Sequence, residues 1–266
     1  MKKIMSPDDE SVTLSVEDGI ATVTLSRPAA RNALSLSAMQ GLYESWEYID
    51  LDPSIRVAIL TSADCGTFCA GMDLKETARV KQETGKDILS FMKDPFHFRM
   101  RRVKVPIVAA MTGHLMAGGM LLSLNCDLRV GLKNTKIGIT ESKIGRGSPW
   151  GMPLLWMLPQ PIVMQMVLTA ELMPIERFLD MGFINFLEDD PDAVRARALE
   201  LAGTIRDNAP LSVQMGKRAL LTAMSVGCDA GLEMAYHIYR PAYESDDAQE
   251  GARAFAEKRP PVWKGK

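Results

Sequence analysis

The sequence lacks a long apolar run and an excess of either charge, and each absence excludes a class of protein. Its 266 residues carry 31 lysines and arginines against 33 aspartates and glutamates, a net charge of −2. We therefore expect neither nucleic acid nor a membrane surface as a partner. The first ten residues have two lysines but no apolar core of a secretory signal, so we expect a cytoplasmic protein.

Cysteine is also scarce, with four residues spread over the chain. Cys65 and Cys69 are four residues apart, but Cys126 and Cys228 do not form the second close pair of a zinc site. We interpret all four as reduced thiols and expect no metal. Methionine is abundant by contrast, with eighteen residues. Methionine fills irregular cores, and a few of these side chains could line a pocket for a lipid-like substrate.

Strand and helix patterns alternate as far as residue 190, and only helices follow. Such alternation predicts an α/β fold. We expect a flexible tail at residues 1–10, a core at 11–190 and a helical segment at 191–266. The apolar faces of these last helices exceed what a small core would cover, which favours packing against a neighbouring subunit.

Several local patterns predict individual elements of this fold. Residues 11–16 and 20–25 alternate apolar and polar around Glu17-Asp18-Gly19, which predicts a hairpin. A helix follows with Ser35 or Ser37 as its N-cap and ends at Asp52-Pro53. The other expected elements are buried strands at Val57–Leu60, Val105–Met111 and Leu128–Val130, mobile helix and loop at 74–102, an apolar helix at Met152–Leu158, and helices opening at Pro191, Pro210 and Ser245.

Two turns resemble each other in having small residues between a strand and a helix. They are "CAGMD", Cys69–Asp73, and "MAGGM", Met116–Met120. Small residues allow another backbone or a ligand to come close. If the fold brings the two turns together, two backbone N–H groups can point at one oxygen, which is the arrangement that stabilises a thioester enolate or a tetrahedral adduct.

With these motifs the chain resembles the enoyl-CoA hydratase/isomerase (crotonase) superfamily. The matching stretches follow one another over residues 11–266 and are "LSRPAARNALS", "VAILTSADCGTFCAGMDLKE", "VKVPIVAAMTGHLMAGGMLLSLNCDLRVG", "GITESKIG" and "EGARAFAEKRPPVWKG". The resemblance implies a crotonase-like spiral of β-β-α units with a helical C-terminal segment for trimerisation. It also implies an acyl-CoA substrate, no separate cofactor, and a homotrimer or a hexamer made of two trimers.

The resemblance also assigns residues to the site. The N–H groups of Met72 and Gly118 correspond to the oxyanion hole, and Glu141 of "GITE" to an acid/base. Positions that correspond to substrate or CoA contacts are Arg31, Ala70, Asp73, Leu74, Lys75 and Leu121. Lys258 and Lys264 could reach the CoA of a neighbouring subunit. Arg31 and both lysines could equally be solvated side chains.

Leu121 decides which reactions are open. Hydratases of this family have two glutamates, and the position of the first holds Leu121 here. A single buried glutamate can take a proton from one carbon and return it to another, so the residue chemistry leans to isomerisation, and hydration stays possible. The alternatives are an acyl-CoA hydrolase, a hydratase-lyase or a non-catalytic acyl-CoA-binding homologue. His97, His114 and His237 form no triad or metal site, and we interpret them as structural or surface residues.

Overall fold

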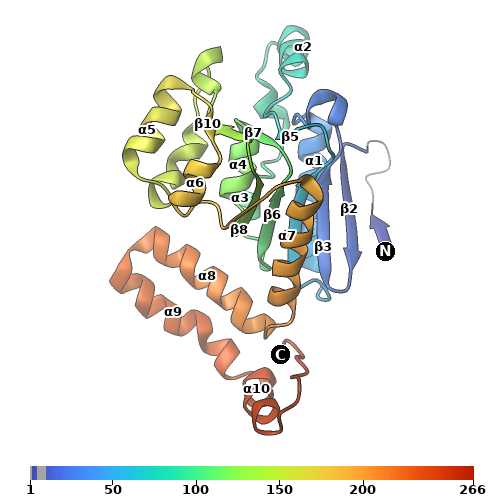
Figure 1. The fold of residues 1–266 in the computed structure, drawn as a ribbon, viewed down its shortest axis with the longest axis vertical. Helices are drawn as coiled ribbons and strands as arrows, with labels where there is room; N and C mark the ends of the chain where they lie inside the picture. Colours follow the sequence, from blue (N-terminus) through green and yellow to red (C-terminus); the bar gives the residue numbers. More distant parts are fainter. Residues whose placement is uncertain (1, 5–9) are drawn as a thin grey trace.

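Two β-sheets carry the fold (Figure 1). The computed structural model describes residues 2–4 and 10–266. Within these residues the larger sheet has seven strands in the order β1-β2-β3-β4-β6-β8-β11, and the smaller has the order β10-β9-β7-β5. The strands of the larger sheet are β1 Lys2–Ile4, β2 Val12–Glu17, β3 Ile20–Leu25, β4 Val57–Ser62, β6 Ile107–Met111, β8 Leu128–Leu132 and β11 Phe186–Glu188. Those of the smaller are β5 Thr67–Cys69, β7 His114–Met116, β9 Lys136–Gly138 and β10 Met173–Pro174.

The chain alternates between the two sheets. Strand β4 joins the larger sheet and β5 the smaller, and the same sequence repeats with β6 and β7 and with β8 and β9. A helix follows each pair: α2 Leu74–Thr84, α4 Gly118–Leu124 and the short 3₁₀ helix η3 Glu141–Ile144. These are the β-β-α units that the sequence predicts. The strands of each repeat are parallel to those of the next, so equivalent turns collect at one end of the smaller sheet.

The remaining helices complete the fold. They are η1 Pro28–Ala30, α1 Leu36–Leu51, η2 Ile88–Phe91, α3 His97–Met100, η4 Pro149–Trp156, α5 Gln160–Thr169, α6 Glu176–Asp180, α7 Pro191–Arg206, α8 Pro210–Val226, α9 Cys228–Tyr243 and α10 Asp246–Ala256. Within the described residues, no helix combines the length and the hydropathy that crossing a membrane requires.

The predicted hairpin is confirmed in its register and in its turn. Strands β2 and β3 pair antiparallel from Glu17↔Ile20 to Val12↔Leu25. Asp18 and Gly19 have φ values of 47° and 73°, and two positive φ values are what a two-residue hairpin turn requires. Residues 2–4 of the expected tail pair with β2 as β1. The expectation for residues 1 and 5–9 lies outside the described residues.

Other predicted boundaries hold or shift by a few residues. Ser35 is the N-cap of α1, since its side chain accepts a hydrogen bond from the N–H of Ala38. The strand predicted from Val105 begins instead at Ile107, whose N–H donates to the Asp127 carboxylate at 2.7 Å. The apolar helix predicted at Met152–Leu158 is wrong in type, because η4 is a 3₁₀ helix that starts at Pro149.

Two apolar layers cover the larger sheet. On one face Val57 and Ile59 of β4 pack with Val108 of β6 and with Val194 and Ala198 of α7. The alternate residues of these strands face the larger core, which includes α1 and α4. This period of two is the pattern of a sheet that is buried on both faces. The expected helical segment begins at residue 191, and its first helix, α7, covers the sheet.

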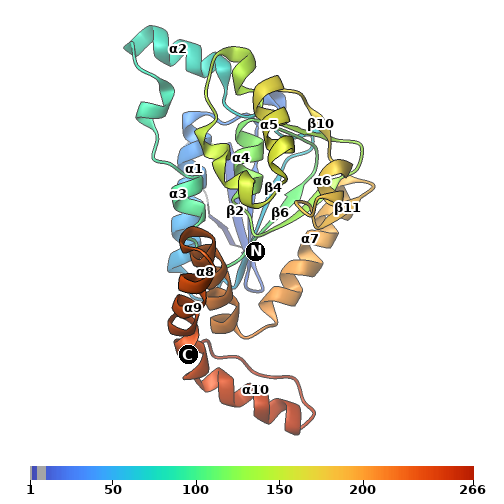
Figure 2. The same ribbon diagram turned by 90° about the vertical axis from the view of Figure 1, so that its left-hand side faces the viewer.

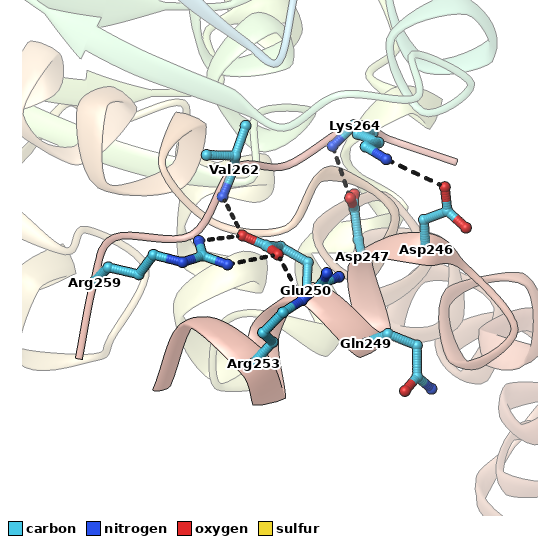
Figure 3. A pocket seen from close by; sticks show the side chains of 8 residues that line it. All are labelled: Asp246, Asp247, Gln249, Glu250, Arg253, Arg259, Val262 and Lys264. Carbon is cyan, nitrogen blue, oxygen red and sulfur yellow. Dashed lines mark hydrogen bonds and ion pairs between the residues drawn. The ribbon is translucent and has the colours of Figure 1, made fainter. Parts of the chain in front are cut away.

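The last three helices extend away from the sheets (Figures 1 and 2). Helices α8 and α9 pack against each other, and α10 contacts α9. The tail then folds back along α10 (Figure 3): Glu250 accepts hydrogen bonds from Arg259 and from the Val262 N–H, and Asp247 from the N–H groups of Lys264 and Gly265. The carboxylates of α10 therefore hold the chain end in place.

Candidate active site

A cavity of about 980 Å³ lies at the end of the smaller sheet. Apolar side chains make up most of its wall, and Met72, Gly118 and Glu141 lie on it together. The lining residues are Leu34, Ala70, Met72, Leu74, Leu89, Met92, Asp94, Phe96, His97, Phe98, Met116, Ala117, Gly118, Leu121, Thr140, Glu141, Lys143, Ile144, Arg146, Gly147, Pro149, Trp150, Met152 and Pro153. A cavity of this size and lining is typical of a small-molecule site.

Parallel pairing of β5 and β7 brings the two small-residue turns together. The partners are Thr67↔His114 and Cys69↔Leu115, so both strands end at the same edge. Just beyond them, Gly71 and Gly118 touch: a Cβ at Gly71 would lie 3.1 Å from the Gly118 nitrogen. Gly71 has a φ of 88°, which favours glycine at this position.

The hydrogen bonds around Leu34 orient the Met72 amide. The Leu34 N–H donates to the Gly71 carbonyl at 2.8 Å, and the Leu34 carbonyl accepts from the Asp73 N–H at 3.0 Å. Leu34 and Met72 thus form a parallel bridge. In a parallel bridge the residue that lies between the two bonded groups points its own N–H away from the partner segment. The Met72 N–H is therefore directed away from Leu34, and within the described residues it has no recorded acceptor.

The Gly118 amide is available for a related reason. Gly118 is the first residue of α4, so its N–H has no partner within the helix. The preceding Ala117 has φ 50° and ψ −112°, a backbone state that costs on the order of 1–3 kcal/mol. The Ala117 N–H donates to the Gly138 carbonyl, and its own carbonyl accepts from the Leu121 N–H, both at 3.0 Å. These bonds hold the strained turn that places Gly118 beside Gly71.

Glu141 brings a carboxylate into this apolar cavity. The residue opens η3 and is 8% exposed, and its Oε2 atom is buried without a hydrogen-bond partner among the described residues. Burial raises the pKa of Glu141, while hydrogen bonding from the Trp150 side chain and nearby backbone N–H groups lowers it only in part. A carboxyl with a raised pKa can both accept and return a proton near neutral pH.

An ion pair ties two parts of the wall together. The Arg146 guanidinium donates to both carboxylate oxygens of Asp87, at 2.9 and 3.0 Å. It holds the pKa of Asp87 below its usual range. Asp87 precedes η2, which carries Leu89, and Arg146 follows Glu141 closely in the chain. The pair therefore fixes the distance between the η2 wall and the η3 wall.

The other sequence-predicted residues divide into two groups. Ala70, Leu74 and Leu121 line the cavity with the proposed catalytic groups. Arg31, Asp73 and Lys75 are outside its lining. The Arg31 carbonyl accepts from the Ala70 N–H at 3.1 Å, and Lys75 is exposed on α2.

Asp73 is the N-cap of α2. The sequence itself indicates this role, since an aspartate before a helix is a typical N-cap. Its carboxylate accepts from the N–H groups of Lys75 and Glu76 at the start of α2. It also pairs with Arg27 at 2.9 Å. Burial opposes ionisation of Asp73, but these bonds outweigh it and hold its pKa below the usual range.

Sequence reasoning missed the wall formed by residues 89–98. Phe96 and Phe98 line the cavity, and so does His97, for which the sequence predicts a structural or surface role. The clustering of apolar residues between 89 and 98 was a usable signal. The placement of His97 was not visible locally, because it depends on a contact with α4.

Comparison with known proteins decides the family. The family model described as enoyl-CoA hydratase/isomerase matches residues 15–266. The chain belongs to the enoyl-CoA hydratase/isomerase family. It is 34% identical to the (E)-benzylidenesuccinyl-CoA hydratase of Thauera aromatica, over 96% of this chain and 99% of that protein. It is 36% identical to an enoyl-CoA hydratase of Mycobacterium tuberculosis, over 90% and 91% of the two chains.

Solved structures of this family confirm the predicted crotonase-like fold. The enoyl-CoA hydratase from Bacillus anthracis superposes with a TM-score of 0.89 at 27% identity, covering 96% of this chain and all of that one. The enoyl-CoA hydratase from Mycobacterium tuberculosis gives 0.86 at 34% identity, over 97% of this chain and all of that one.

The geometry at Gly118 makes a first prediction. A Cβ there would come within 2.7 Å of Leu34 Cδ1 and 3.2 Å of Gly71 Cα. We expect Gly118→Val to displace the amide and lower kcat by roughly 10²-fold, the scale of losing one oxyanion donor. Steady-state kinetics with an enoyl-CoA checks this. Gly203→Val on α7 is the matched control, because a Cβ at Gly203 meets open space. Normal turnover in a folded Gly118→Val protein would rule out this use of the amide.

The buried Glu141 carboxylate, which has one oxygen without a hydrogen-bond partner among the described residues, makes a second prediction. Because its folded pKa is raised above 4.5, the native state holds the proton more tightly than the unfolded state. The resulting stability is present at low pH and is lost as pH rises through the folded pKa. At neutral pH, Glu141→Gln should therefore have a larger free energy of unfolding than the parent, by on the order of 1–3 kcal/mol. This difference in free energy should disappear below pH 4.5. Urea titrations across pH measure it, and a gap independent of pH would contradict the assignment.

Proposed function

We propose that the protein adds water to, or moves the double bond of, an enoyl-CoA thioester, with Glu141 as the single acid/base. The observation that carries the proposal is a buried carboxylate with one unpaired oxygen in the same cavity as the Met72 and Gly118 amides. The family supports this reading, and relatives at 28–36% identity are named as hydratases.

In this mechanism the two amides receive the thioester oxygen. Addition at Cβ, or removal of a proton from the acyl chain, moves electrons onto that oxygen, and two fixed N–H donors stabilise the charge as it develops. Because the donors belong to the backbone of a strand end and a helix start, they need little reorganisation. The apolar wall excludes water around them, which strengthens their interaction with the enolate.

Glu141 then handles the proton. As a carboxylate it takes a proton from carbon or from water, and as the acid it returns that proton to another carbon of the acyl chain. Leu121 presents no second acid at the position where two-glutamate hydratases have one. Asp94 also lines the cavity, but its two oxygens accept hydrogen bonds from the N–H groups of Phe96 and Phe98. It is therefore occupied in holding the start of α3.

The lining of the cavity supports a proposal for the class of acyl group. Methionines and aromatic rings face the space around Glu141, and such a wall has few groups to bind a polar chain. We therefore propose an apolar acyl chain or ring. The similarity to a hydratase named for a benzylidenesuccinyl thioester supports a bulky group.

Glu141→Gln tests the proposed function. The change keeps the shape of the side chain but removes the proton shuttle, so we expect kcat to fall about 10²–10⁴-fold for both hydration and isomerisation. Binding of CoA thioesters should change little. Product analysis with linear and aryl-substituted enoyl-CoA substrates measures both reactions. Glu83→Gln on the exposed face of α2 is the control, and an active Glu141→Gln enzyme would remove Glu141 from the mechanism.

We also propose that the chain assembles into a homotrimer or a pair of trimers. Exposed large apolar side chains lie along the helices that leave the core, including Leu220 of α8 at 71%, Tyr236 of α9 at 70% and Phe255 of α10 at 88%. Apolar exposure on this scale favours a protein interface. Sedimentation equilibrium should give three or six times the 29.3 kDa chain mass, and a stable monomer at micromolar concentration would contradict the proposal.

A further inference from the structure

His97 lies on the cavity wall beside the helix that carries Leu121. It is the first residue of α3 and is half-buried. Its side chain contacts Asn125, which caps the C-terminal end of α4 one turn beyond Leu121. His97, Leu121 and Glu141 all line the same cavity, so the cavity that lacks the second carboxylate contains an imidazole.

The contact with Asn125 fixes which ring nitrogen of His97 carries the proton. The Asn125 Nδ2 donates to the Leu121 carbonyl at 2.8 Å, so its Oδ1 is the atom that faces His97. That oxygen lies 3.0 Å from His97 Nδ1. Since Oδ1 can only accept, Nδ1 must be the donor, and in the neutral ring Nε2 is then an acceptor. Nε2 makes no hydrogen bond within the described part of the chain.

The surroundings keep this ring neutral. Burial and the positive charge of Arg101 lower the pKa of His97, while the bond to Asn125 and the charge of Asp94 raise it by less. At neutral pH the ring therefore presents a lone pair on Nε2. A neutral acceptor in an apolar wall can hold the hydrogen of a water molecule or of a hydroxyl group.

On the basis of the proposed function, we propose that His97 Nε2 binds the water that adds to the enoyl thioester. This gives the cavity two acceptors for one water, the Glu141 carboxylate and the imidazole, and restores the two-point hold that Leu121 removes. A single acceptor would leave the water free to rotate, and poor positioning of a reactant is costly in rate.

The step balances without any further reactant. The water oxygen forms a bond to Cβ, and the double-bond electrons move onto the thioester oxygen between the two amides. One water proton passes to Glu141, which then delivers it to Cα as the thioester carbonyl re-forms. The other proton stays on the new hydroxyl group at Cβ and donates a hydrogen bond to His97 Nε2 throughout. The imidazole is thus a water-binding group and is unchanged at the end.

Isomerisation provides an internal control, because moving a double bond needs Glu141 but no water. We expect His97→Phe, which keeps a flat ring without an acceptor, to lower hydration by roughly 10–10²-fold and to leave isomerisation within about threefold. His97→Gln keeps an acceptor at similar reach and should recover most of the hydration. Both rates are measured on one enoyl-CoA substrate by product analysis.

Each other outcome overturns the proposal. Equal loss of both reactions would make His97 a structural residue, and unchanged hydration would remove it from the site. A parent enzyme that isomerises without hydrating would also refute it. His97→Leu makes the same comparison if the phenylalanine variant does not fold. Failure of the proposed function is seen separately, because it would appear as full activity of Glu141→Gln.

Discussion

The site depends on one close approach, that of the backbones at the ends of β5 and β7. Two glycines make it possible. A Cβ at Gly119 would lie 2.4 Å from the Cys69 carbonyl oxygen, and one at Gly71 would lie 3.1 Å from the Gly118 nitrogen. Side chains at these positions would separate the two strand ends and with them the two amides. The small residues of both turns are therefore required by packing before any substrate is present.

The site lowers the stability of the folded protein in two ways. The chain holds Ala117 in a strained turn and buries a carboxylate oxygen of Glu141 without a partner. Strain and unpaired polar groups cluster at functional sites because the surrounding core can hold them. Here the parallel pairing of β5, β7 and β9 and the apolar layer around α4 supply that support. The desolvation that destabilises the ionised Glu141 also raises its pKa, which is the property that the proposed acid/base role requires.

Local signals in the sequence were enough for much of the fold. The Asp18-Gly19 turn, the Ser35 cap and the paired small-residue turns each depend on neighbouring residues, and each was predictable. The meeting of the two turns was expected from the family resemblance, but other contacts between distant segments were not predictable. Arg27 and Asp73 are 46 residues apart, and α7 packs on residues of β4 and β6 that lie far earlier in the chain. Periodicity shows that a face is apolar, but it does not show what covers that face.

His97 illustrates the same limit at the site itself. Nothing near it in the sequence distinguishes it from a surface histidine, because its role depends on Asn125, whose orientation depends in turn on the Leu121 carbonyl. The exchange of glutamate for leucine in α4 then has a physical consequence beyond the loss of an acid. Two carboxylates around one water repel each other and raise each other's pKa. A neutral imidazole in the same cavity would accept that hydrogen bond without the repulsion. On our proposal, the cavity therefore holds its water with one charge where a two-glutamate site uses two, and Glu141 stays ionised to lower pH than it would beside a second acid.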